Sequence, residues 1–387
     1  AVELKIGIIG LDSSHGVEFA KLWHDPASPW HVPGARVVAA YPGGSADWAL
    51  SYQRVEGFTA QMRDEFGVRI AATIEAVVAE VDAVMILSVD GRVHPEQLDA
   101  VVAAGKPVFI DKPLALSVVE VDRMQRLAAA KRTRIWSASS WRFAAGLKRA
   151  LGELGGRCED ATVGGPWPLF DGLHGWAFYG MHHIELLYAA MGVGCVSVSC
   201  IQQGATETLT GQWADGRRGV ITAAHDQEGE FWGHFSRQGR TVQMEVTDTL
   251  RARYAALLRE VLACFHGAEL PVAGIETRET IAFLPRIFES GIAGWHLGRG
   301  VASDASNARA ADRVGGAVVV VCDAVGGGVE FCQWGDGANP RGGADGDDQL
   351  LADGGGIGLD RPGAKPELVG GGGGAAGPRC GRGGCRA

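Results

Sequence analysis

The sequence predicts an α/β protein in which a doubly wound parallel sheet is followed by an α+β domain with a mostly antiparallel sheet. Three observations support this fold class. Short strands that are apolar on both faces alternate with helices over residues 1–134, which is typical of a parallel sheet covered on both sides. Residues 135–300 instead place several strands of alternating polarity in succession, as antiparallel sheets do. The composition changes again after residue 300.

The first domain, residues 1–134, opens with the apolar run LKIGIIG at 4–10 and the helical pattern SSHGVEFAKLWHD at 13–25, with Ser13 and Ser14 as candidate caps. Further strands are expected at 35–41, 68–71, 82–88 and 107–112. Further helices are expected at 47–66, 73–80, 94–105 and 117–131. Because parallel strands require right-handed crossovers, this order predicts a nucleotide-binding type of domain.

The second domain, residues 135–300, begins with the strand IWSAS at 135–139. A helix at 144–154, a Trp- and Gly-rich stretch and a helix at about 179–191 follow. Strands are expected at 195–202, 206–213, 217–225, 230–237 and 240–246, several of them joined by Gly-containing turns. Helices at 247–266 and 276–292 complete a domain that covers one face of its sheet.

The remaining residues, 301–387, are a Gly-rich tail of low complexity. They hold 24 of the 58 glycines and only two aromatic residues, Phe331 and Trp334. Runs such as GGGGG at 370–374 have high backbone entropy and few side chains to pack, so disorder is expected. A GC-rich gene read out of frame has the same composition, so a frameshifted origin is the other interpretation. No function is assigned to the tail.

Charge and hydropathy narrow the classes of function. The net charge is -9 at pH 7, and no stretch supplies a clustered basic face, so nucleic acid is not an expected partner. Apolar runs such as 81–88 are much shorter than the roughly 20 residues that span a bilayer, so no membrane span is expected. The N-terminal residues show no secretory signal, and a cytoplasmic location is expected. The eight cysteines form no CxxC pair, which predicts neither disulfides nor a zinc site.

The turn after the first strand carries part of a dinucleotide-binding pattern. In GIIGLDSSH at 7–15, Asp12 and His15 replace the last two glycines of a GxGxxG set that starts at Gly10. The glycines of such a turn let the backbone approach a diphosphate at the helix N-terminus. A plain strand–turn–helix, with Asp12 or Ser13 as the N-cap, is the alternative. The expected cofactor contacts in this turn are Gly7, Gly10, Asp12, Ser13 and Ser14.

The end of the second strand bears on the choice between NAD and NADP. Tyr41 and the following Pro-Gly-Gly-Ser at 42–45 stand where an acidic residue accepts the adenosine ribose hydroxyls in NAD-binding domains. We therefore count Tyr41 among the cofactor contacts, and expect weak discrimination or a preference for NADP.

The strongest signal is GKPVFIDKPLALS at 105–117, where a strand runs into Asp111-Lys112-Pro113. A lysine at the carboxyl end of a parallel strand points into the crevice in which ligands bind. There its charge could hold a substrate hydroxyl and favour the loss of its proton as hydride leaves. A surface lysine beside a helix-starting proline is the alternative.

This segment resembles the Gfo/Idh/MocA oxidoreductases, the family of glucose-fructose oxidoreductase and inositol dehydrogenase. Their hallmark is Glu-Lys-Pro after the fifth strand of a Rossmann domain, preceded by an Ala-Gly-Lys turn that 104–106 matches, while Asp111 replaces the Glu. His94, which follows SVDGR at 88–92, resembles the histidine that opens the preceding helix in the family. The resemblance adds Ser88, His94, Asp111 and Lys112 to the NAD or NADP contacts.

The resemblance continues into the second domain. Trp136 to Arg142 is similar to the family's strand and arginine, which makes Arg142 a candidate substrate contact or, equally, an interface salt bridge. FYGMHHIELLYAAMG at 178–192 looks like the family's Gly-x-His-x-x-Asp helix, which implies His182 as proton acceptor. Phe178 stands where the assisting aspartate is found in inositol dehydrogenase-like members. The partners left for His182 are Lys112, Glu185 and Asp171, with His183 as a further substrate-side candidate.

The resemblance covers about residues 4–295 and leaves two functional hypotheses open. The first is an NAD(P)-dependent oxidoreductase that moves a hydride between the nicotinamide and a secondary alcohol of a sugar, cyclitol or related polyhydroxyl compound. The second is a non-redox member: a lyase with a tightly bound cofactor, or a ligand-binding or regulatory protein. Because His182 and His183 diverge on a helix, no metal site is expected. The family likeness also implies a homodimer or homotetramer.

Overall fold

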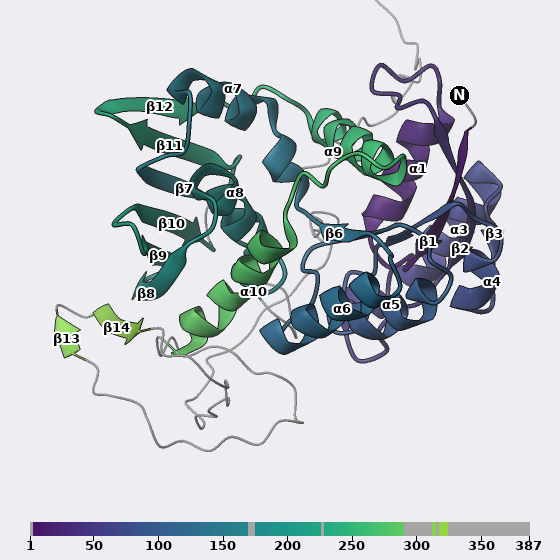
Figure 1. Cartoon of the computed structure of the whole chain (residues 1–387), viewed down its shortest axis with the longest axis horizontal. Helices are drawn as coiled ribbons and strands as arrows, with labels where there is room; N and C mark the ends of the chain where they lie inside the picture. The colour runs from purple at the N-terminus through teal and green to yellow at the C-terminus, as the bar shows by residue number, and fades with distance from the viewer. Residues whose placement is uncertain (1–2, 169–174, 226–227, 290–311, 315–316, 324–387) are drawn as a thin grey trace, which may run out of the picture. The chain divides into compact units, whose positions relative to one another are not determined.

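The computed structural model in Figure 1 contains two β-sheets with helices packed on them. It describes residues 3–168, 175–225, 228–289, 312–314 and 317–323. None of the helices in these ranges combines the length and apolar character needed to cross a membrane.

The first sheet is parallel throughout, with the strand order β3-β2-β1-β4-β5-β6. Its strands are β1 (Leu4–Ile9), β2 (Ala35–Tyr41), β3 (Arg69–Ile70), β4 (Ala83–Ile86), β5 (Val108–Ile110) and β6 (Ile135–Ser137). Its helices are α1 (Ser14–His24), α2 (Ala49–Tyr52), α3 (Val55–Phe66), α4 (Ile74–Val78), α5 (His94–Val102) and α6 (Val118–Ala130). The order reverses between β1 and β4, and ligands of such sheets bind beyond the strand ends at that point. The doubly wound fold class is confirmed.

Local signals explain where these helices begin and end. The side chains of Ser13, Thr73 and Ser117 accept hydrogen bonds from amides in the first turns of α1, α4 and α6. Gly67, with a φ of 66°, ends α3. The single helix predicted over 47–66 is divided into α2 and α3.

The second sheet has the order β12-β11-β7-β10-β9-β8-β14-β13, and all its pairs except β7 with β10 are antiparallel. Its first six strands along the chain are β7 (Asp160–Pro166), β8 (Cys195–Gln203), β9 (Thr206–Trp213), β10 (Arg218–Ala224), β11 (Trp232–Arg237) and β12 (Arg240–Met244). The helices with it are η1 (Ser140–Phe143), α7 (Ala145–Leu154), α8 (Met181–Met191) and α10 (Gly274–Glu289). The mostly antiparallel second sheet is confirmed.

Strand β7 lies between β11 and β10 in the interior of this sheet, although no strand was predicted there. Its second half is Gly164-Gly165-Pro166, which is a loop signal in sequence. A Cβ on Gly164 would lie 2.3 Å from the Trp232 ring, so the glycine makes room for the indole of the neighbouring strand. The residue is used for close packing rather than for a turn.

Two elements expected in the second domain belong to the first sheet or its core. Strand β6 pairs in parallel with β5, so the sheet extends past residue 134. Helix α9 (Leu250–Phe265) packs Tyr254, Leu258 and Val261 into the same buried cluster as Ile8 and other β1 residues. The first domain is therefore completed by a helix that follows the second-domain strands in sequence.

Two short strands of the Gly-rich tail extend the second sheet. They are β13 (Asp312–Val314) and β14 (Ala317–Asp323), and β14 pairs antiparallel with β8. The sequence did not predict them. The rest of the tail lies outside the described residues.

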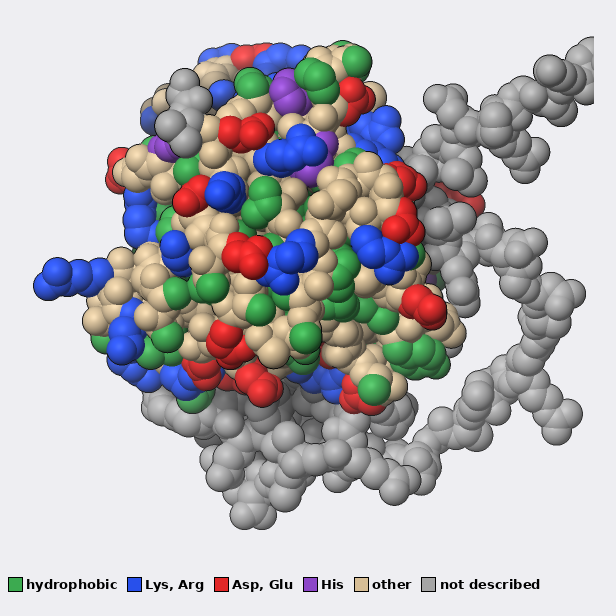
Figure 2. Space-filling view, turned by 90° about the vertical axis from the view of Figure 1, so that its right-hand side faces the viewer, with side chains coloured by type: hydrophobic (Ala, Val, Ile, Leu, Met, Phe, Trp, Pro, Cys, Tyr) green, Lys and Arg blue, Asp and Glu red, His purple; other side chains and the backbone are tan. Residues whose placement is uncertain are grey.

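Figure 2 shows the face that lies to the right in Figure 1. Acidic and basic side chains are interspersed over this face, and no patch of one sign stands out.

Candidate active site

The turn between β1 and α1 requires a glycine at one position only. Gly10 has a φ of 93°, and a Cβ there would lie 2.3 Å from the Ser88 amide nitrogen on the neighbouring strand end. Gly7 was predicted to contact the cofactor, but a Cβ there would lie 2.6 Å from Val77 of α4. Gly7 therefore serves helix–sheet packing.

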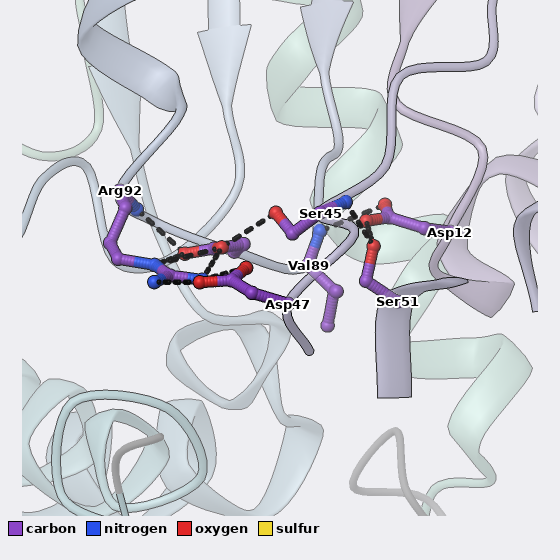
Figure 3. Close-up of polar contacts among 7 residues, drawn as sticks. Asp12, Ser45, Asp47, Ser51, Val89 and Arg92 are labelled. Carbon is purple, nitrogen blue, oxygen red and sulfur yellow. Dashed lines mark hydrogen bonds and ion pairs between the residues drawn. The ribbon is translucent and has the colours of Figure 1, made fainter. Parts of the chain in front are cut away.

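Asp12 is fully buried, and its side chain points toward Ser51 and Val89 (Figure 3). Its carboxylate accepts hydrogen bonds from the Ser51 hydroxyl at 2.6 Å and the Val89 amide at 3.0 Å. Burial raises the pKa of Asp12, although both hydrogen bonds oppose this effect. Ser13, and not Asp12, caps α1, because its hydroxyl accepts the His15 amide at 3.1 Å.

The segment that follows β2 is tied to the loop after β4 (Figure 3). The Ser45 hydroxyl donates to Asp90 at 2.6 Å. Arg92 forms ion pairs with Asp90 at 2.7 Å and with Asp47 at 2.9 Å. In the same segment, Trp48 meets the Phe178 ring of the second domain edge-on at 5.3 Å. The segment therefore contacts both the loop after β4 and Phe178 of the second domain.

These observations test whether the turn suits a dinucleotide. The positive φ of Gly10 gives the backbone its close approach, and α1 presents its N-terminus beside the turn. The Asp12 carboxylate is engaged by Ser51 and Val89, and burial favours its neutral form. The expected repulsion between this carboxylate and a diphosphate is thereby reduced, and the residues fit the group. Ser14 opens α1, next to the amides that would receive the phosphates.

The other residues that were predicted to contact the cofactor differ in their hydrogen-bond partners. The Tyr41 carbonyl accepts the Gly10 amide at 2.9 Å and so fixes the turn. The Ser88 hydroxyl accepts a hydrogen bond from Gln97 at 2.8 Å. Both ring nitrogens of His94 lie 2.8 Å from carbonyl oxygens, those of Ser88 and Pro113. His94 thus joins the segments that follow β4 and β5. Its contact with a cofactor stays a prediction.

Lys112 follows β5 at the carboxyl edge of the parallel sheet, and its peptide bond to Pro113 is cis. It is 6% exposed. Its Nζ lies 3.4 Å from the Phe178 carbonyl oxygen and 4.4 Å from the centre of the Phe178 ring. The Phe178 ring thus contacts the Lys112 ammonium group. At this position in the sequence, the resemblance leads one to expect an aspartate.

Asp111 uses both carboxylate oxygens. One accepts the Lys112 amide at 2.8 Å, and the other lies 2.5 Å from Nδ1 of His15. Burial pushes the pKa of Asp111 upward, but the charge and hydrogen bond of His15 and the charge of Lys112 together hold it below its usual value.

The two histidines of α8 have different surroundings. Nδ1 of His182 lies 2.7 Å from the Ser139 hydroxyl. Burial and then the charge of Lys112 keep the pKa of His182 well below its ordinary value, so the imidazole is neutral near pH 7. His183 packs 4.5 Å from the Phe231 ring, and burial lowers its pKa to about 3.

Arg142 and Glu185 form a buried ion pair with each other. A second carboxylate, Glu276 of α10, lies 2.5 Å from the same guanidinium. The salt bridge is thus the alternative that the structure supports for Arg142. Substrate binding by Arg142 and acid–base work by Glu185 stay predictions. Asp171 lies outside the described residues.

The sequence analysis did not identify three buried residues near Lys112 and His182. His15 had a usable signal, because it stands at a glycine position of the turn pattern. Ser139 belongs to no sequence motif that marks a functional residue. Arg253 of α9 lies 3.9 Å over the Trp141 ring and lowers the pKa of His182, and its helix gave no indication of a site.

A known family matches the first domain of the chain, and solved structures match both domains. Residues 4–139 match the model of the GFO_IDH_MocA family, described as an oxidoreductase family with an NAD-binding Rossmann fold. No curated protein matches the sequence. Residues 4–139 extend through β6, in agreement with the first sheet.

Solved structures share the fold across both domains. Apo scyllo-inositol dehydrogenase from Lactobacillus casei has a TM-score of 0.62 at 15% identity, covering 75% of this chain and 96% of that one. Myo-inositol 2-dehydrogenase from Lactobacillus plantarum gives 0.59 at 18%, covering 74% and 97%. An oxidoreductase from Agrobacterium radiobacter gives 0.60 at 15%, covering 76% and 98%. Residues 4–139 therefore match an NAD-binding Rossmann domain of the Gfo/Idh/MocA type, and the chain as a whole shares its fold with these dehydrogenases.

Proposed function

We propose that this protein is an NAD(P)-dependent dehydrogenase that oxidises a secondary alcohol of a sugar, cyclitol or related polyhydroxyl compound. The observation that carries the proposal is the pair formed by Lys112 and His182. A buried ammonium group and a buried neutral imidazole influence each other at the carboxyl edge of the parallel sheet, beside the cofactor turn. This combination supplies a cation for a developing alkoxide and a base for its proton.

The two side chains take complementary roles. Lys112 binds the substrate hydroxyl oxygen and stabilises negative charge on it. In the tautomer that we propose, the proton of His182 is on Nδ1, which donates a hydrogen bond to the Ser139 hydroxyl 2.7 Å away. The lone pair of Nε2 then accepts the hydroxyl proton. The nicotinamide ring of NAD(P) supplies the hydride acceptor.

The electrostatics keep His182 in the neutral form that can accept a proton. The charge of Lys112 disfavours a second positive charge on His182, so the imidazole is kept neutral and ready to accept a proton. For the same reason, an imidazolium formed by the reaction releases its proton readily.

The substrate class rests on the fold relatives. A scyllo-inositol dehydrogenase from Lactobacillus casei was crystallised with NAD(H) and scyllo-inositol, and the Agrobacterium radiobacter oxidoreductase with NAD+ and L-tartaric acid. Both ligands carry secondary hydroxyls on adjacent carbons. A cytoplasmic homodimer or homotetramer is part of the same proposal, and light scattering that shows only monomer at micromolar concentration would contradict the assembly.

A fluorescence titration tests the function in two steps. NADH and NADPH are first added to the purified full-length protein, and saturable binding of either is expected. NAD+ or NADP+ reduction is then followed with cyclitols, sugars and hydroxy acids. Binding without turnover on any of these favours the non-redox lyase, and absence of binding favours a ligand-binding or regulatory protein.

A further inference from the structure

The contact between His15 and Asp111 joins the cofactor turn to the Asp-Lys-Pro segment. His15 stands in the first turn of α1, at the third glycine position of the pattern, and Asp111 follows β5. Their Nδ1 and Oδ2 atoms lie 2.5 Å apart, and both residues are buried, with exposures of 8% and 5%. A hydrogen bond to a carboxylate is stronger than one between neutral groups.

The ring of His15 is held in place from two sides. It stacks on Phe19, one turn later in α1, with the ring centres 5.2 Å apart. Tyr254 of α9 meets it edge-on at 5.1 Å. The imidazole therefore has little freedom to leave Asp111, and its position follows that of α1.

Asp111 connects the His15 ring to the backbone of Lys112. The oxygen that does not face His15 accepts the backbone amide of Lys112 at 2.8 Å. The carboxylate is thus fixed at both oxygens, between the His15 ring and the peptide from which the Lys112 side chain leaves. His182 of α8 also interacts electrostatically with His15.

We propose that His15 is a positioning residue, which acts through Asp111 to hold Lys112 in its reactive place and links it to the N-terminus of α1. The inference rests on the proposed function and deepens it. A glycine at position 15 would pack the helix closely on the sheet, but it has no side chain to reach Asp111. The departure from the glycine pattern thus belongs to the acid–base machinery.

Two variants separate the hydrogen bond from the ring packing. His15→Phe keeps a ring for Phe19 and Tyr254 to contact but removes the donor, whereas His15→Gln keeps a donor and loses the ring. His31→Phe, in the loop after α1, is the matched control, because its Nδ1 lies 3.0 Å from the Leu22 carbonyl oxygen rather than from a carboxylate.

The first measurement needs neither cofactor nor substrate. Acetic anhydride labels lysine amines, and mass spectrometry compares the labelling rate of Lys112 with that of the exposed Lys131. His15→Phe is expected to change this ratio by about threefold or more, because a shifted amine meets different neighbours. His15→Gln and His31→Phe should keep the ratio of the unaltered protein.

The second measurement uses NADH and any alcohol that the protein oxidises. His15→Phe should lower kcat by about tenfold or more while the KM for the alcohol and the Kd for NADH stay within about threefold, because misplacement of a reacting group affects turnover. His15→Gln should restore most of kcat. An unchanged labelling ratio together with unchanged kcat in His15→Phe overturns the inference, as does a parallel loss in both variants. Failure to bind NADH would instead reject the proposed function, and the labelling result would still decide the role of His15.

Discussion

At the residue scale, the proposed chemistry depends on a buried cation, Lys112, and a buried neutral base, His182, that interact electrostatically. Lys112→Ala should lower turnover by about a hundredfold or more, because a group that assists proton transfer contributes roughly 10²–10⁴. His182→Ala should have a similar effect, and the double variant should fall well short of the product of the two losses. Steady-state kinetics with NADH titrations check this, since the cofactor Kd should stay the same.

The variant His183→Ala serves as the control for His182→Ala. Its ring packs against Phe231 and Trp176, so His183→Ala should reduce thermal stability and affect turnover less than His182→Ala. Near-normal turnover of Lys112→Ala on an oxidised substrate would show that the assigned mechanism is wrong.

The burial of Asp12 predicts how the stability of the protein depends on pH. Burial raises its pKa in the folded protein above 3.8, so the folded state holds the proton more tightly than the unfolded chain. The resulting stability is present below the unfolded pKa and is lost as pH rises through the folded pKa. Asp12→Asn removes the buried charge and keeps an oxygen for the Val89 amide. Its melting temperature should exceed that of the unaltered protein at pH 7, with a gap that narrows toward pH 4.

NADH binding adds a control for the Asp12 variant. If the carboxylate is engaged only with Ser51 and Val89, Asp12→Asn should bind NADH as well as or more tightly than the unaltered protein. Weaker binding would identify Asp12 as a direct cofactor ligand.

At the element scale, polar contacts tie the segment between β2 and α3 to the loop after β4. Asp47 and Arg92 are 69% and 36% exposed at their side chains, so their ion pair contributes only about 0–1 kcal/mol to stability. Asp47→Asn should leave the melting temperature nearly unchanged and speed NADH association, measured by stopped-flow fluorescence. Glu80→Gln, which breaks the exposed pair with Arg69, is the matched control and should not alter association. An equal rate in all three proteins would show that this ion pair does not control entry.

The elements also show what sequence patterns can predict. The strands and helices of the first sheet follow from apolar runs and side-chain caps, which act within a few residues. Strand β7 escaped prediction because Gly164 and Gly165 are read as a turn unless the neighbouring Trp232 is known. Lys112 and His182 were found through motifs at a strand end and on a helix. The ion pair of Arg142 with Glu185 joins distant segments, and no local pattern reports such a contact.

At the scale of the whole molecule, residues up to 299 contain the first sheet, strands β7 to β12 of the second sheet and every described site residue. Truncation after Arg299 should change the free energy of unfolding by less than about 1 kcal/mol, because the tail offers few apolar anchors. The deletion removes β14 and leaves the outer edge of β8 unpaired. Chemical denaturation of both forms measures the difference. Aggregation or a much larger loss would show that β14 is needed to cover that edge.

The return of α9 to the first sheet has a consequence for how the protein is made. Its residues Tyr254, Leu257 and Leu258 share a buried cluster with Phe19 and Phe109, which a ribosome synthesises long before them. Until residue 265 has left the exit tunnel, this apolar face has no cover, and the nascent first domain is a natural client for chaperones. A gene fragment that stops at residue 139 should therefore yield insoluble protein, although it encodes every strand of the parallel sheet.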